Sequence, residues 1–407
     1  MDFSSLKNWI TEEKRAEILR WRRELHRHPE MGLELPFTRN FLSAELDRMG
    51  LGGMYRLLEG GIVVDIAGTA GEGSRAVALR VDMDALPLTE RTDVPYASSI
   101  EGYMHACGHD AHTAIGLGIA GVLQELKSRW RGSVRILFQA GEETLEGARL
   151  MVEQGALVSP GVDALIGLHL DPGFPLLSVA LKPGQINAWV DEFSLVVKGK
   201  SSHGAAPHLS RDPITAACYA VQAFQTIVSR NVPPIEAAVI SIGKIAGGNI
   251  YNIIPDQVTM RGTVRCLSSK MRELIISRMK SIMSGIDESF GVRTELVFSS
   301  VSPPVICDEG LTNECFAILN EVLGENRVLH IPHPKMGGDD FAFYAQEVPA
   351  VLIRLGCASD ACAHPLHSSG FNFDEEVMPF GVSLFSYLLI HLLEKNIRKA
   401  GKKKSDA

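Results

Sequence analysis

Apolar residues in the first half of the chain occur either at helical spacing or in short continuous runs. Apolar residues between Ile10 and Leu25 recur at helical intervals and predict a helix over residues 5–29, which Pro29 would end. A second helix is expected over residues 37–50. The runs that follow are rich in β-branched residues and bounded by glycine or proline, which is typical of buried strands. They comprise residues 60–68, 74–87, 132–144 and 162–170.

The order of these elements predicts two domains. Up to residue 187 strands and helices alternate, which indicates an α/β fold with a mostly parallel central sheet. Residues 188–302 then have the order strand, helix, strand, strand, helix, strand, the split βαββαβ unit of ferredoxin-like folds. The first pattern resumes after a proline-containing connection. We therefore expect a catalytic domain of residues 1–187 and 303–407, with residues 188–302 inserted as a second domain.

Side chains that can bind metal ions follow three of the predicted buried strands. The strand in 74–87 ends with Asp82 and Asp84, the next with Glu142 and Glu143, and the strand after that with His169. Open α/β sheets bind ligands at the carboxyl ends of their strands, and a buried unpaired carboxylate is costly. For a single aspartate a helix cap or turn is the alternative. The repetition at three strand ends favours a site for divalent metal ions.

Residues 104–113, MHACGHDAHT, concentrate further donor atoms, and a polar loop near the C-terminus adds His364 and His367. Sulfur and imidazole donors at such spacing suit a transition metal, although a buried thiol flanked by surface histidines is the alternative. His26 and His28, at the end of the first helix, are instead expected to form a surface cluster. The donors within the segment are His105, Cys107, His109, Asp110 and His112.

The number of candidate ligands suggests two metal ions. A single catalytic zinc takes three protein ligands and a water, and the surplus here fits a pair of ions bridged by hydroxide. Cys107 favours zinc, whereas imidazole and carboxylate also accept manganese or cobalt. Neighbouring residues of an extended chain point in opposite directions, so one of the paired glutamates can bind metal while the other acts as general base. Asp84 would orient a ligand imidazole. Together these roles predict metal-assisted hydrolysis of a carbonyl compound.

Composition and charge narrow the class of protein. The chain has 407 residues, 45% hydrophobic and 22% charged, which is ordinary for a soluble globular protein. Its net charge of −8 argues against nucleic-acid binding, and the basic run in residues 395–407 is expected to be a solvated tail. No apolar run approaches the roughly 20 residues of a membrane span, and no signal-peptide pattern is present. We expect a cytoplasmic protein whose cysteines, Cys107 apart, are core or loop thiols.

Eight motifs occur along the chain in this order: RVDMDALP, MHACGHDAHTA, LFQAGEE, GLHLDP, SSHGAAPH, NIIPDQVTMRGTVR, DDFAFY and LHSSGFNFDE. Together they resemble the dinuclear metal amidohydrolases of the aminoacylase/carboxypeptidase family, above all the branch of hippurate hydrolases, N-acyl-amino-acid amidohydrolases and auxin-conjugate hydrolases. The resemblance implies that Glu142 is the general base and Asp84 the partner of a metal ligand. It implies the metal ligands Cys107, His109, Glu143, His169 and His367.

The same resemblance implies roles for the inserted domain. Residues 188–302 would be a lid that also forms a homodimer. His203, in SSHGAAPH, would reach the scissile carbonyl oxygen, often from the partner subunit, where an imidazole can stabilise the developing oxyanion. Asn252 and Arg265 would hold the substrate carboxylate. Without the resemblance, Arg265 would be taken for a surface strand arginine.

The predicted function is hydrolysis of the amide bond of N-acyl or N-aroyl amino acids by a metal-bound hydroxide with a glutamate general base. Each subunit would hold two divalent ions, zinc or manganese, with cobalt as a further candidate. A dipeptidase or carboxypeptidase of the same family is an alternative, because it also recognises a free carboxylate. A catalytically silent metal-binding protein is a third, but it predicts a broken ligand set, and every ligand is present. The expected partners are the small-molecule substrate and a second copy of the chain, with no nucleic acid and no membrane.

Overall fold

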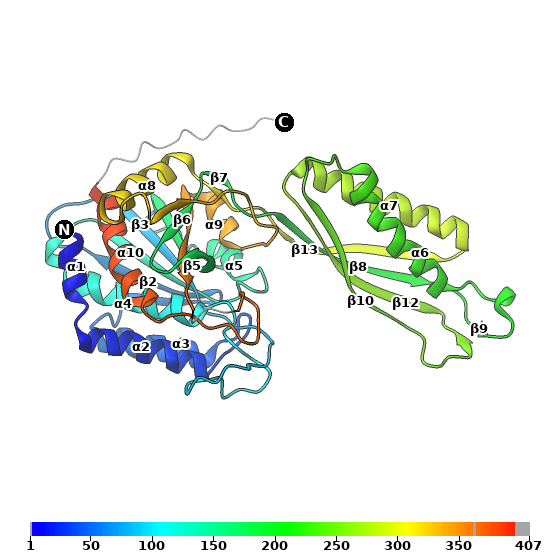
Figure 1. Cartoon of the computed structure of the whole chain (residues 1–407), viewed down its shortest axis with the longest axis horizontal. Coiled ribbons are helices and arrows are strands. Elements are labelled where there is room, and N and C mark those ends of the chain that lie inside the picture. Colours follow the sequence, from blue (N-terminus) through cyan, green and yellow to red (C-terminus); the bar gives the residue numbers. More distant parts are fainter. Residues whose placement is uncertain (1, 361–363, 395–407) are drawn as a thin grey trace. The chain divides into compact units, whose positions relative to one another are not determined.

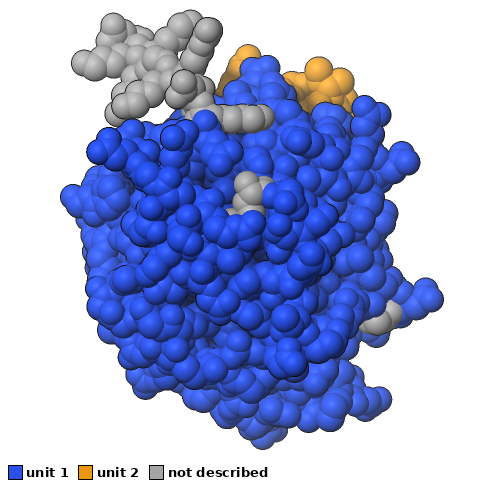
Figure 2. Space-filling model, turned by 90° about the vertical axis from the view of Figure 1, so that its left-hand side faces the viewer, with its two compact units in different colours: residues 1–184, 305–332, 340–407 blue, residues 185–304, 333–339 orange. Residues whose placement is uncertain are grey.

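The computed structural model describes residues 2–360 and 364–394, which form two compact units (Figure 2). Unit 1 consists of Met1–Gly184, Val305–Pro332 and Asp340–Ala407, and unit 2 of Gln185–Pro304 and His333–Asp339. The boundaries expected from the sequence are 187/188 and 302/303, whereas the two units divide at 184/185 and 304/305 and residues 333–339 lie in unit 2. The basic run at residues 395–407 and Cys362 lie outside the described residues.

An eight-stranded sheet forms the centre of unit 1, in the order β1-β2-β4-β3-β5-β16-β6-β15. The four central strands β4, β3, β5 and β16 are parallel, whereas β1, β2 and β4 pair antiparallel at one side and β6 runs antiparallel to β16 at the other. The predicted α/β fold with a mostly parallel centre is confirmed. The strands are β1 Tyr55–Leu58, β2 Gly61–Ala67, β3 Ala76–Asp82, β4 Ser133–Gln139, β5 Ala164–Pro175, β6 Val179–Leu181, β15 Val328–His330 and β16 Ala350–Ala358.

Helices cover this sheet, with α4 at the centre of the packing (Figure 1). α4 contacts α2, α10 and β3. The single helix predicted over residues 5–29 is in fact two, because the Thr11 side chain caps α2 by accepting the Lys14 N–H at 3.4 Å. The helices are α1 Phe3–Trp9, α2 Glu12–Arg27, α3 Pro36–Arg48, α4 His109–Glu125, α5 Gly147–Glu153, α8 Glu309–Leu323, α9 Phe341–Glu347 and α10 Val377–Glu394.

Helix α10 is, among the described residues, the one helix long and apolar enough to cross a membrane. From the sequence, no apolar run of this length was expected. Most of its length is buried inside unit 1, where it packs against α4, α8 and β16. A helix that is apolar on all sides and covered on all sides is typical of a protein core.

Unit 2 contains a four-stranded antiparallel sheet in the order β10-β12-β8-β13, with α6 and α7 on one of its faces (Figure 1). Phe193, Phe224 and Ile275 are among the buried residues that join these helices to the sheet. The βαββαβ order expected from the sequence is present: β8 Trp189–Lys198, α6 Pro213–Thr226, β10 Ala238–Gly247, β12 Gln257–Cys266, α7 Ser269–Phe290 and β13 Arg293–Ser302. Shorter elements of the chain are β7 Gly184–Gln185, β9 Ser202–His203, β11 Ile253–Ile254, β14 Ile306–Cys307, η1 Lys127–Arg129, η2 Pro207–Leu209 and η3 Ile227–Asn231.

Candidate metal centre

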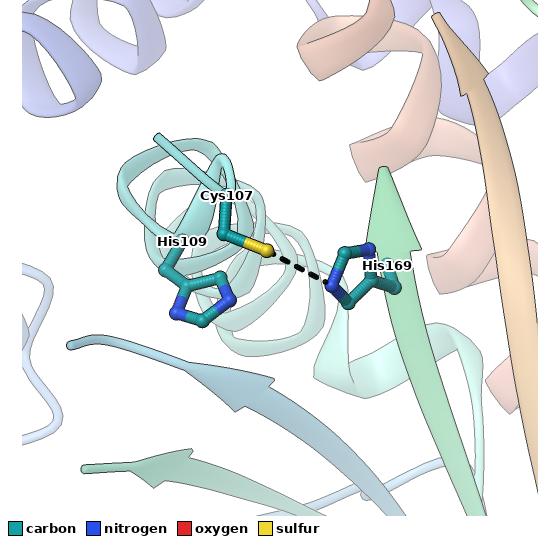
Figure 3. Close-up of side chains that lie close together, drawn as sticks. All are labelled: Cys107, His109 and His169. Carbon is teal, nitrogen blue, oxygen red and sulfur yellow. Dashed lines mark hydrogen bonds between the residues drawn. The ribbon is translucent and has the colours of Figure 1, made fainter. Parts of the chain in front are cut away.

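The parallel strands of unit 1 bring distant segments to one edge of the sheet. β3, β4 and β5 are neighbours, so the residues at their carboxyl ends lie close together. Cys107 precedes α4 and His109 begins it, while His169 lies in β5 (Figure 3). Gly108, between the first two, has a φ of 85°, a left-handed conformation that glycine adopts without strain. This turn into α4 allows the Cys107 side chain to approach His169, which lies in the middle of β5 rather than at the strand end expected from the sequence.

Most of the candidate ligands lie within a few ångströms of Cys107. Its Sγ is 3.5 Å from His169 Nε2 and 3.3 Å from His367 Nε2. His367 Nε2 is in turn 3.4 Å from Glu143 Oε1. Overlapping donor groups of this kind are what a pair of ions needs. Three such groups found among the described residues are Cys107, His109 and His169; Cys107, Glu143 and His367; and His109, Glu142 and Glu143.

Two buried donor atoms in these groups fit a metal ion better than they fit a metal-free interior. Among the described residues, His109 Nε2 and Glu143 Oε1 are buried without a hydrogen bond, and Glu143 Oε1 has only the ion pair with His367. Such atoms are costly unless something pairs with them. The neighbouring Cys107 and Glu143 raise the pKa of His367 to about 10, and burial raises the pKa of the Cys107 thiol. Thiol, imidazole and carboxylate donors together suit a divalent transition metal.

Asp84 connects these candidate ligands, although not through the atoms that we expected. Its main-chain carbonyl, 2.8 Å from His109 Nδ1, accepts the ring hydrogen bond. Its carboxylate accepts the backbone N–H groups of Glu142 at 3.0 Å and Glu143 at 2.9 Å, which leaves Oδ1 3.6 Å from His109 Nδ1. Because a carbonyl can only accept, Nδ1 carries the proton, and the lone pair of the neutral ring is on Nε2.

Asp82 and His112 support the centre from within the core. Asp82 Oδ1 is 2.5 Å from His112 Nδ1, and Arg80 donates to the other oxygen of Asp82 at 2.5 Å. His112 Nε2 accepts the backbone N–H of Leu170 at 2.9 Å, next to His169. These side chains are fully buried. Since Asp82 and His112 are already hydrogen-bonded, we assign them to the support of β5 rather than to a metal ion.

The loop that carries His367 is fastened beside Cys107. The backbone N–H of His367 donates to the Ala106 carbonyl at 2.8 Å. His367 has a φ of 60°, which is rare for a residue other than glycine and is found where the surroundings enforce it, often at functional sites. The other histidine of the loop, His364, lies against Gly370 and belongs to none of the donor groups found among the described residues.

A buried network of charged side chains joins α2 to α4, and the sequence pattern did not predict it. His26, expected in a surface cluster, is buried, with Nδ1 2.8 Å from Asp110 Oδ2 and Nε2 3.2 Å from Glu90. Arg22 donates to the same Asp110 oxygen at 2.8 Å. Burial alone would raise the pKa of Asp110, but the charges of Arg22 and His26 outweigh it and hold the pKa well below its usual range. The spacing of Arg22 and His26, one helical turn apart, was the signal available.

The three remaining candidates, His203, Asn252 and Arg265, lie in unit 2. His203 is exposed, and its Nδ1 accepts the backbone N–H of Ala205 at 3.0 Å. The pairing of β9 with β11 places the segment of Asn252 beside that of His203. Arg265 is half-buried and donates from Nη1 to the Met336 carbonyl at 3.0 Å. The roles expected for these residues stay predictions.

Comparison with known proteins gives matches across both units. The family described as Peptidase family M20/M25/M40 matches residues 78–391. The chain is 39% identical over 369 residues to an N-acetyl-L-cysteine deacetylase of Bacillus subtilis (90% of this chain, 86% of the relative). It is 34% identical over 402 residues to thermostable carboxypeptidase 2 of Saccharolobus solfataricus (97% and 98%). A crystal structure from Bacillus subtilis, described as a dinuclear metal binding peptidase from the M20 family, has a TM-score of 0.77 at 31% identity, covering 94% and 99%.

Proposed function

This chain belongs to the peptidase family M20/M25/M40, and we propose that it removes the acyl group from N-acyl or N-aroyl amino acids. Membership of this family confirms the resemblance of its motifs and the expectation of an amide hydrolase. The observation that carries the proposal is the convergence of overlapping metal-donor groups beside a buried glutamate at the end of a parallel sheet. The proposed ligands are Cys107, His109, Glu143, His169 and His367.

Two divalent cations, zinc, manganese or cobalt, would act here as Lewis acids and increase the acidity of a water molecule. Glu142 is the proposed general base, which accepts a proton from the attacking water on its carboxylate and delivers it to the leaving amine. Its side chain is buried, with Oε2 4.0 Å from His109 Nε2, and its backbone N–H is held by Asp84. This anchored position supports the role, because a proton carrier must keep its place between the two transfers.

We assign recognition of the substrate to unit 2. His203 would donate a hydrogen bond to the developing oxyanion, and Asn252 with Arg265 would bind the free carboxylate. The hydrogen bond to the Met336 carbonyl supports this by orienting the guanidinium of Arg265. We further propose that unit 2 forms a homodimer in a cytoplasmic enzyme. Ile235 and Tyr251 are almost fully exposed, and exposed apolar side chains of this size are common at protein contacts.

A dipeptidase or carboxypeptidase is the second candidate, favoured by the carboxypeptidase among the relatives. Both activities require recognition of a free carboxylate and the same hydrolytic chemistry. They differ in whether the group on the far side of the amide is an acyl chain or an amino acid with a charged amine.

Metal-reconstituted protein tests the proposal directly. The purified chain, stripped of metal and loaded with zinc, manganese or cobalt, is assayed for amine release from N-acetyl amino acids, hippurate and dipeptides. We expect metal-dependent hydrolysis of the N-acyl amino acids, with dipeptides cleaved more slowly. Faster cleavage of dipeptides would favour the second candidate. A protein that binds metal yet hydrolyses none of these substrates would contradict both candidates and support the catalytically silent alternative.

A further inference from the structure

Arg354, in β16, is a buried arginine without a carboxylate partner. Its side chain is 8% exposed. In the part of the chain that the structure describes, its guanidinium takes part in no hydrogen bond, ion pair or ring contact. An arginine cannot shed its charge, so a buried one is normally paired. The other buried arginines of unit 1 follow that rule: Arg22 pairs with Asp110, Arg80 with Asp82 and Arg135 with Asp65.

The position of Arg354 is next to the candidate metal centre. β16 runs parallel to β5, and Arg354 is in register with His169. Residues in register on neighbouring strands have their side chains on the same face of the sheet. Arg354 therefore projects to the face from which His169 approaches Cys107.

The guanidinium of Arg354 keeps a small exposed area although most of the residue is buried. None of its nitrogens is among the fully enclosed polar atoms that lack a hydrogen-bond partner. Because the guanidinium also has no hydrogen-bond partner among the described residues, its nitrogens must each be partly exposed. It is a cation with free donors at the carboxyl edge of a parallel sheet, the edge at which such folds bind their ligands. An anion from solution is the partner that this arrangement lacks.

We propose that Arg354 is a specificity-determining residue that binds a second carboxylate of the substrate, in addition to the one assigned to Asn252 and Arg265. The proposal rests on the proposed function and names its preferred substrate class: N-acyl amino acids that carry two carboxylates. The second carboxylate belongs either to an acidic amino acid or to a dicarboxylic acyl group. A guanidinium binds a carboxylate through two parallel N–H···O bonds. A neutral amide in the same place would leave the charge of Arg354 unpaired.

Matched pairs of acid and amide substrates test the two sources of this carboxylate. One pair is N-acetyl-L-glutamate and N-acetyl-L-glutamine, and the other is N-succinyl-L-alanine and N-succinamoyl-L-alanine. We expect the wild-type enzyme to prefer the acid by at least about tenfold in kcat/KM in one pair, mainly through KM. Arg354→Gln should abolish that preference while metal content and kcat/KM for the amide stay near wild type. Arg149→Gln, an exposed arginine in α5, is the control and should keep the preference.

Arg354→Lys provides a second variant, because it keeps the charge and loses only the two-pronged geometry; we expect it to retain part of the preference and to remain folded. Binding gives a readout independent of turnover. Glutarate should bind metal-loaded wild-type protein more tightly than glutaramate in calorimetry, and Arg354→Gln should remove the difference.

Several results would overturn the proposal. Equal kcat/KM for acid and amide in both pairs would do so, as would an Arg354→Gln variant that loses activity equally on both members of a pair, which indicates a structural role. Failure of the proposed function looks different, because then N-acetyl-L-alanine and all four test substrates are left intact. In that case the comparison of glutarate with glutaramate still decides whether Arg354 binds a carboxylate.

Discussion

At the scale of single residues, Cys107 and Glu142 have separable parts in the proposed chemistry. Of the three overlapping donor groups named above, Cys107 belongs to two and Glu142 to one, which it shares with His109 and Glu143. A free cysteine is otherwise an ordinary small core residue, and Cys218, on α6, is exposed. The neighbours of each residue, rather than its type, therefore determine what its loss should do.

Cys107→Ala and Glu142→Gln should separate metal binding from turnover. Cys107→Ala removes a donor common to two groups, so the metal-to-protein ratio measured by mass spectrometry should fall. Glu142→Gln leaves the proposed ligands in place, so metal should stay bound while kcat drops about 10²–10⁴-fold, the usual contribution of a general base. Cys218→Ala is the matched control for the thiol and should equal wild type. A Glu142→Gln enzyme with near wild-type kcat would exclude the base assignment.

At the scale of elements, the turn from Cys107 into α4 joins local conformation to the metal centre. Gly108 has a left-handed φ, and a Cβ added to it would lie 2.9 Å from Leu170 Cδ1. The backbone and the space around it therefore both favour glycine. The residues on either side are two of the proposed ligands, so any shift of this turn moves them.

Gly108→Ala should weaken both folding and metal retention. The left-handed conformation costs a residue with a Cβ about 1–2 kcal/mol, which should appear as lower stability in urea unfolding monitored in unit 1. Metal release to a chelator should be faster. Gly285→Ala is the control: this glycine is inside α7, a Cβ there meets nothing within 4 Å, and alanine favours a helix by up to about 1 kcal/mol. Equal behaviour of the two variants would contradict the role given to the turn.

Element prediction succeeded where the local signal was unambiguous. The buried strands of unit 1 and the βαββαβ order of unit 2 were expected from apolar runs and periodicity, and both are present. The break between α1 and α2 was not expected, because apolar spacing continues through it and only the Thr11 cap marks it. His26 was placed on the surface because one helix, seen alone, does not reveal which other helix will cover it.

At the scale of the whole molecule, the proposal that His203 acts from the partner subunit of a homodimer can be tested by mixing variants. If His203 acts across a homodimer, mixing Glu142→Ala with His203→Ala subunits should restore activity, because one site of each mixed dimer then has both residues intact. Random exchange would recover about a quarter of wild-type activity. Light scattering should show a dimer for each variant alone. A dimer that exchanges subunits without any recovery would place His203 within its own subunit.

The sequence by itself determined which side chains are available to the metal centre. Metal-donor side chains at strand ends and in one short segment are features of the local sequence, which can be recognised before the packing of the strands is known. Only the tertiary structure decided which atoms these residues use: the carbonyl of Asp84 for His109, and the backbone of Leu170 for His112. It also showed that Arg354 has no carboxylate partner among the residues that the structure describes. Hydrogen bonds and ion pairs between distant segments depend on how elements pack, which no local pattern specifies.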